Sequence, residues 1–130
     1  MPGSHSTLKI GLIGFGGWAT SAYVPALRRR DDVEIVALAA RTESTRMTGR
    51  SLLGNAVRLY DNYHDLLGDP AVDAVMIGLP SESSVEAASA ALDAGKHVFL
   101  EPPFPNDASA TGLLDKAERS PHVFHLDLEL

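Results

Sequence analysis

A short apolar segment, residues 8–13, leads directly into the glycine-rich run Gly14-Phe15-Gly16-Gly17-Trp18-Ala19. The apolar segment predicts a strand, and the residues after the run predict a helix, so the run is expected to join the two. Gly14 would permit the sharp turn, Gly16 would leave room for a pyrophosphate beside the backbone, and Ala19 would let helix and strand pack closely. Free N–H groups at the helix N-terminus would bind the phosphates.

This run predicts a dinucleotide-binding turn in which Gly14, Phe15, Gly16, Gly17 and Trp18 contact the cofactor. Together with Gly11, the glycines exceed what a simple turn needs, although an ordinary turn that merely uses glycine is the alternative. Trp18 would either pack over the diphosphate or belong to the core.

Strand-like and helix-like segments alternate along the whole chain, which is typical of βαβ units. The expected strands cover residues 8–13, 33–40, 56–59, 72–77, 97–100 and 123–128. The expected helices cover residues 17–30, 43–53, 63–67, 81–94 and 107–117, with Thr42 or Ser44 and Ser81 or Ser83 as caps of the second and fourth. This order predicts an α/β fold of the Rossmann type: a doubly wound, mostly parallel six-stranded sheet with helices on both faces. Residues 1–7 are expected to be a disordered lead-in, and residues 8–130 one nucleotide-binding domain.

Composition narrows the function classes. The 130 residues include no cysteine and carry a formal net charge of −6. The absence of cysteine excludes disulfides and thiolate metal sites and suits a cytoplasmic protein. The acidic balance argues against nucleic acid as a partner, and no apolar run approaches the roughly 20 residues that cross a bilayer. The five histidines form no recognisable metal motif, so no metal site is predicted.

The residues after the second strand bear on which dinucleotide is bound. NAD-binding domains usually carry Asp or Glu here to accept hydrogen bonds from the ribose 2′-hydroxyl. This chain instead reads Ala40-Arg41-Thr42. The planar guanidinium of Arg41 suits a 2′-phosphate, and Thr42, Ser44 or Arg46 would add donors. NADP is therefore the predicted cofactor in preference to NAD, with a solvated surface role for Arg41 as the alternative.

Several motifs together resemble the N-terminal domain of the Gfo/Idh/MocA oxidoreductases. The resemblance covers the chain from Lys9 to about Leu128. The matching stretches are Gly11-Leu12-Ile13-Gly14-Phe15-Gly16, Val24-Pro25-Ala26-Leu27, Val36-Ala37-Leu38, Val72-Asp73-Ala74-Val75 and Ala94-Gly95-Lys96-His97-Val98, the last leading into Glu101-Pro102-Pro103.

The resemblance implies that Leu79 and Pro80 lie beside the nicotinamide end of the cofactor. Glu101, at the carboxyl end of a strand, would contact the cofactor or brace its loop. Two departures stand out: Ser84 replaces a usual histidine, and Pro102 replaces a usual lysine. Lys96 is a poor substitute because it precedes its strand and would lie at the opposite edge of the sheet. No catalytic residue is therefore assigned to the chain.

Three hypotheses remain open at this point. The chain would be the cofactor domain of an NADP-dependent oxidoreductase that transfers hydride to or from a small polar, sugar- or polyol-like substrate. This activity would belong to the full-length protein, since the family's C-terminal substrate domain is expected to be missing from the present sequence. Alternatively it would be an inactive dinucleotide-binding module, or one completed by a partner. A scaffold that binds nothing is the third reading. A homodimer is expected if the surface normally covered by the second domain is hidden by self-association.

Overall fold

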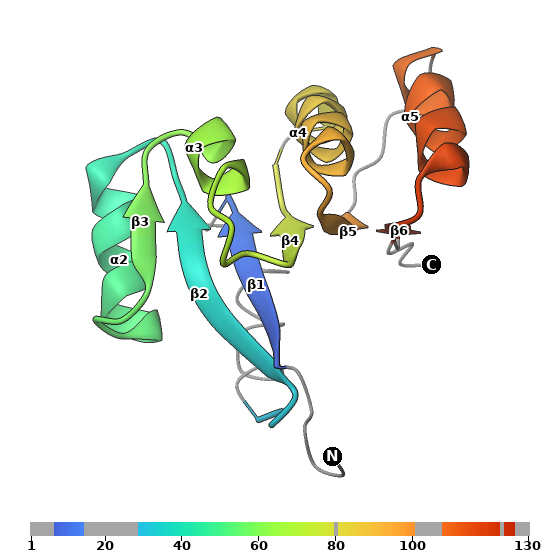
Figure 1. The fold of residues 1–130 in the computed structure, drawn as a ribbon. Coiled ribbons are helices and arrows are strands. Elements are labelled where there is room, and N and C mark those ends of the chain that lie inside the picture. The colour runs from blue at the N-terminus through green and yellow to red at the C-terminus, as the bar shows by residue number, and fades with distance from the viewer. Residues whose placement is uncertain (1–6, 15–28, 80, 101–107, 123, 127–130) are drawn as a thin grey trace, which may run out of the picture.

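The computed structural model describes residues 7–14, 29–79, 81–100, 108–122 and 124–126 (Figure 1). The strands are β1 (Leu8–Ile13), β2 (Val33–Ala39), β3 (Arg58–Tyr60), β4 (Ala74–Ile77), β5 (His97–Leu100) and β6 (Phe124–Leu126). The helices are α2 (Glu43–Leu53), α3 (Tyr63–Leu67), α4 (Ser81–Asp93) and α5 (Ala108–Arg119).

The described strands form one sheet in the order β3-β2-β1-β4-β5-β6, and every neighbouring pair is parallel. The chain builds outward from β1 to β3 on one side, then returns to place β4 on the other side of β1. The strand order therefore reverses between β1 and β4, and such a switch point leaves a crevice at the carboxyl ends of the strands. The predicted Rossmann-type α/β fold is confirmed.

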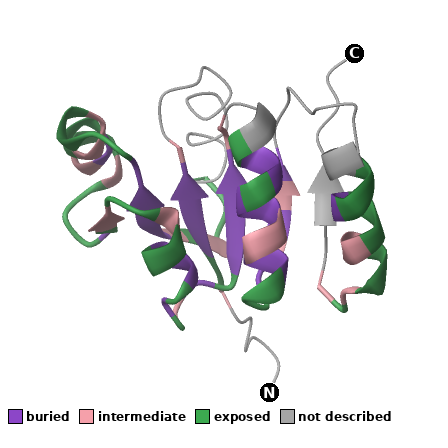
Figure 2. Ribbon diagram, turned by 90° about the horizontal axis from the view of Figure 1, so that it is seen from above, coloured by how far each residue is buried: buried purple, intermediate pink, exposed green. Residues whose placement is uncertain are grey.

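Side chains of the strands alternate between two apolar clusters, one on each face of the sheet. Ile13 and Ala37 face the cluster that contains Leu66 of α3, Ala88 of α4 and Leu113 of α5. Leu12, Leu38 and Met76 face the second cluster, which receives Leu53 of α2. Figure 2 shows the buried strands between the helices. Burial on both faces explains why the strands read as nearly continuous apolar runs.

The helix boundaries follow from local chemistry. The hydroxyl of Thr42 accepts a hydrogen bond from the Thr45 amide and caps α2, so Thr42, rather than Ser44, is the cap. Gly54 ends α2 with a φ of 100°. Helix α4 begins at Ser81, so both Ser81 and Ser83 lie inside the helix and neither stands at the cap position before it. Alanine suits this helix because its fully buried Ala87, Ala88 and Ala91 allow a close approach to the core.

Some predicted boundaries were wrong by about two residues. The third strand covers Arg58–Tyr60 rather than residues 56–59, because pairing with β2 begins at Arg58, although Val57 is already buried in the core. The fourth strand begins at Ala74 rather than at Val72, because the Val72 amide donates to the Asp69 carbonyl in a turn. Most of the expected helix over residues 17–30 and the lead-in before residue 7 lie outside the described residues.

Gly11, which the sequence grouped with the glycines of the nucleotide turn, has a packing role in the structure. A Cβ at Gly11 would lie 2.8 Å from Cδ2 of Leu66 and 3.3 Å from Cγ1 of Val72. Glycine at this position therefore leaves room for the side chains of Leu66 and Val72 over β1.

Candidate functional site

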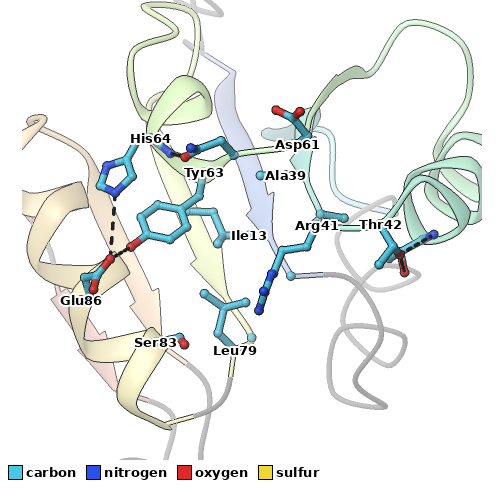
Figure 3. A pocket seen from close by; sticks show the side chains of 15 residues that line it. Ile13, Ala39, Arg41, Thr42, Asp61, Tyr63, His64, Leu79, Ser83 and Glu86 are labelled. Carbon is cyan, nitrogen blue, oxygen red and sulfur yellow. Dashed lines mark hydrogen bonds and ion pairs between the residues drawn. The ribbon is translucent and has the colours of Figure 1, made fainter.

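A pocket of about 570 Å³ opens at the carboxyl edge of the sheet, over the switch point between β1 and β4 (Figure 3). Its size lies in the usual range for small-molecule sites, and its place follows the rule for open α/β sheets. Its wall combines strand ends with the first turns of helices. The described lining residues are Ile13, Gly14, Ala39, Ala40, Arg41, Thr42, Thr45, Asp61, Asn62, Tyr63, His64, Gly78, Leu79, Ser83 and Glu86.

Gly14 is held where no side chain fits. Its φ is +84°, and a Cβ there would lie 2.5 Å from the Gly78 carbonyl oxygen and 2.8 Å from Cδ2 of Leu79. The Gly14 amide donates to the Ala39 carbonyl at 2.9 Å, and the Gly78 amide donates to the Ile13 carbonyl at 2.9 Å. These bonds hold the ends of β1, β2 and β4 together and leave bare backbone at the pocket. Such a cradle fits a phosphate-bearing group.

Arg41 is the cationic group on the β2 side of the pocket. It follows the end of β2, it is exposed, and Figure 3 shows its side chain directed towards Leu79. Thr42 and Arg46 beside it are already engaged within the chain. The Thr42 hydroxyl donates to Oγ1 of Thr45 at 2.8 Å, and Nη1 of Arg46 donates to the Ala40 carbonyl at 2.7 Å. These two residues stabilise the turn that presents Arg41.

Tyr63 and Glu86 form a cluster on the opposite side of the pocket. The Tyr63 hydroxyl donates a short hydrogen bond to Oε1 of Glu86, which joins α3 to α4, and Nε2 of His64 lies 4.0 Å from the same oxygen. Burial raises the pKa of Tyr63 to about 12, with the Glu86 carboxylate adding to the effect. Tyr63 therefore stays protonated and remains a donor at neutral pH.

Sequence reasoning missed this cluster and also Asp61. A ribose-binding carboxylate is expected at the end of β2. Asp61 instead follows the end of β3, and it also lines the pocket. The available signal was Asp61-Asn62 at the end of a strand and before a helix, where polar side chains face the crevice. Tyr63 and Glu86 are 23 residues apart, and no local pattern links them.

Four of the predicted cofactor-binding residues, Gly14, Arg41, Thr42 and Leu79, line this one pocket. The other six lie outside the described residues: Phe15, Gly16, Gly17, Trp18, Pro80 and Glu101. Pro102 also lies outside them.

Ser84 and Lys96, the two described residues that bear on the family's catalytic positions, both point into the protein. Ser84, at the position of the usual histidine, is fully buried within α4. Lys96 is buried at the amino edge of the sheet, as expected, where its ammonium group donates to the carbonyls of Asp69 at 3.0 Å and Val72 at 2.6 Å. Lys96 therefore cannot serve the pocket at the carboxyl edge.

The described part of the chain offers neither a metal site nor a membrane-spanning helix. No group of three or more histidine or acidic side chains there is arranged to hold a metal ion. None of the helices in the same ranges is both long and apolar enough to cross a membrane.

Comparison with known proteins agrees with this geometry. A family described as "Oxidoreductase family, NAD-binding Rossmann fold" matches residues 8–128. The chain is 31% identical over 135 residues to D-xylose 1-dehydrogenase (NADP(+)) of Hypocrea jecorina, a match that covers 96% of this chain and 34% of the relative. It is 29% identical over 113 residues to inositol 2-dehydrogenase of Salmonella typhimurium, covering 87% of this chain and 34% of the relative.

Among solved structures, the chain resembles a 3-ketoreductase of Actinomadura kijaniata in complex with NADP and TDP-benzene. The TM-score is 0.82 at 29% sequence identity, and the match covers 92% of this chain and 37% of that one. The chain thus spans about a third of the length of the curated relatives it matches.

Proposed function

The chain belongs to the Gfo/Idh/MocA oxidoreductase family as an NAD(P)-binding domain, and we propose that it binds NADP in preference to NAD. In the full-length protein this domain would serve hydride transfer to or from a small polar substrate of the sugar or polyol kind. The substrate class rests on the names of relatives such as the xylose and inositol dehydrogenases.

The observation that carries the NADP preference is the position of Arg41. Its guanidinium lines the pocket directly after β2, where the ribose 2′ position of a dinucleotide lies in this fold. A guanidinium forms charge-assisted, bidentate bonds with a phosphate, and it offers no acceptor to a 2′-hydroxyl. The turn beneath it is fixed by Thr42 and Arg46, so the side chain starts from a defined position.

Each described residue of the pocket contributes to binding in its own way. Gly14 leaves backbone uncovered for the diphosphate, while Ile13 and Leu79 form an apolar wall for a base. When bound, the nicotinamide of such a cofactor supplies the hydride chemistry. The protein's part here is to bind and orient the cofactor.

Asp61 is the residue on which the competing preference for NAD would depend. Its carboxylate lines the same pocket and can accept hydrogen bonds from a ribose hydroxyl. It follows β3 rather than β2, however, which places it one strand beyond the usual position of the ribose carboxylate.

A second candidate function, a dinucleotide-binding module without hydride transfer, is favoured by two residues. Pro102 has no side-chain donor or acceptor to act as an acid or base, and Ser84 is fully buried. The pocket described above requires neither residue for cofactor binding.

Isothermal titration of the 130-residue chain with NADPH and with NADH tests the proposal. We expect NADPH to bind at least about tenfold more tightly, since a charge-assisted hydrogen bond contributes about 1.5–3 kcal/mol. Equal affinities, or tighter binding of NADH, would overturn the NADP preference. Turnover of any sugar or polyol by the chain itself would exclude the inactive module.

A further inference from the structure

The pocket carries a guanidinium on its β2 side and a carboxylate on its α4 side, with an apolar surface between them, and Asp61 adds a second carboxylate after β3. Arg41 stands on the β2 side, and the carboxylate of Glu86 stands on the α4 side (Figure 3). Leu79 and the ring of Tyr63 lie between them, and both pack against the apolar cluster that contains Leu66 and Ala88 (Figure 3). A ligand that fits this pocket is flat and apolar in the middle. It carries an anionic group at the end near Arg41 and a hydrogen-bond donor at the end near Glu86.

We propose that Glu86, positioned by Tyr63, selects an adenine base by accepting a hydrogen bond from its exocyclic 6-amino group. This inference rests on the proposed NADP-binding function and adds a residue that distinguishes the base. Adenosine 2′-phosphate has the features that this pocket requires: a phosphate for Arg41, a flat purine for Leu79 and Tyr63, and an amino group for the carboxylate. Leu79 would then contact the adenine, whereas the family resemblance implies contact with the nicotinamide.

Glu86 is arranged to accept such a bond. Its side chain is 72% exposed, so a ligand can reach the carboxylate. Among the described residues, its hydrogen bond from Tyr63 and its 4.0 Å contact with Nε2 of His64 both involve Oε1. Within the described part of the chain, Oε2 is thus left for a donor from the ligand. The bond from Tyr63 also restricts the side-chain rotamers, which lowers the entropy lost when a ligand is held.

The chemistry of a carboxylate makes this arrangement selective. An ionised carboxylate is only an acceptor, so it attracts an amino group and repels a carbonyl oxygen. Adenine carries a 6-amino group, whereas hypoxanthine carries a 6-oxo group at the same position. A carboxylate placed at position 6 discriminates against an analogue that presents an acceptor there, because the bond to the 6-amino group is replaced by repulsion between two oxygens.

Tyr63 is a positioning residue in this account. Its hydroxyl donates to Oε1 of Glu86 and joins the start of α3 to α4, so it fixes where the carboxylate stands. Loss of the hydroxyl should loosen Glu86 and weaken base discrimination without removing the carboxylate. A purely structural role for Tyr63 would instead change affinity for all bases alike.

The test compares the affinities of NADPH and of reduced nicotinamide hypoxanthine dinucleotide phosphate, its 6-oxo analogue. For the unmodified chain we expect the analogue to bind about 10–100-fold more weakly, the range for one hydrogen bond to a charged group. Glu86→Gln should bring the ratio of the two affinities close to one, because an amide can donate to the 6-oxo group as well as accept. Tyr63→Phe should reduce the ratio partially.

Glu118→Gln is the matched control, since Glu118 is exposed on α5 and does not line the pocket. It should leave the ratio unchanged. An unmodified chain that binds both compounds equally, or a ratio that Glu86→Gln does not alter, would overturn the role of Glu86. If NADPH and NADH bind equally while the base is still discriminated, only the NADP preference fails. If no dinucleotide binds, both proposals fail.

Discussion

A Cβ atom on Gly14 would lie 2.5 Å from the carbonyl oxygen of Gly78, at the point where the parallel strands β1 and β4 both end. Gly14→Ala therefore combines an unfavourable positive φ with a clash against backbone, which cannot move aside as a side chain can. We expect it to lower the free energy of unfolding by about 2–5 kcal/mol, the sum of the two effects. Urea unfolding followed by circular dichroism measures this loss.

Gly54→Ala is the control for the backbone conformation alone. Gly54 also has a positive φ, of 100°, but nothing lies within 4 Å of a Cβ placed there. Gly54→Ala should lower the free energy of unfolding by only about 1–2 kcal/mol. Equal losses for the two variants would show that the contact with Gly78 does not matter.

Gly49 tests how closely α2 packs on the sheet. A Cβ at Gly49 would overlap Cδ2 of Leu38, whose side chain is fully buried. Gly49→Ala should therefore destabilise the fold by about 1–3 kcal/mol despite the better helix propensity of alanine. Gly112→Ala in α5 meets nothing within 4 Å and should stabilise the fold by about 0.5–1 kcal/mol. Thermal unfolding of both variants checks the opposite signs, and stabilisation by Gly49→Ala would contradict the packing.

Asp69 should make stability depend on pH. Burial alone would raise the pKa of its carboxyl, but hydrogen bonds from the Ala71 amide, the Tyr60 hydroxyl and the Arg58 guanidinium outweigh burial and lower that pKa. A lowered pKa in the folded state stabilises the protein above the unfolded-state pKa of about 3.9, and this stabilisation is lost as the pH falls through the folded-state value.

Asp69→Asn should therefore reduce the free energy of unfolding at pH 7 by about 1–3 kcal/mol. The gap between the two proteins should narrow as the pH falls below about 4, where the unfolded carboxyl is protonated. Urea unfolding of both proteins at about pH 7 and about pH 3 measures this difference in the free energy of unfolding. A gap of the same size at both pH values would contradict the assigned role of the carboxylate.

Lys96 should be far more sensitive to replacement than a surface lysine. Lys96→Met removes the buried donor to the Asp69 and Val72 carbonyls and should cost about 1–3 kcal/mol. Lys116→Met removes bonds to Ser89 and Asp93 at a more exposed site and should cost less than about 1 kcal/mol. Chemical unfolding of both variants provides the comparison, and similar losses would argue against a structural role for Lys96.

The fold and one side of the site were predictable because they depend on local patterns. Alternating apolar segments indicate the parallel sheet, and the lack of a carboxylate directly after β2 indicates Arg41 as a cofactor-binding residue. The close contact of Gly11 with Leu66 and the bond from Tyr63 to Glu86 were not predictable. Each depends on how α3 packs, and no spacing in the sequence reports that packing.

The most direct test of the central claim is the ratio of NADPH to NADH affinity before and after Arg41→Ala, measured by calorimetry. The ratio should fall by about 10–100-fold, because the variant loses a charge-assisted bond to the 2′-phosphate while NADH loses nothing comparable. Arg119→Ala, an exposed arginine on α5, should leave the ratio unchanged. A ratio that Arg41→Ala does not alter would contradict the assignment of this pocket to NADP.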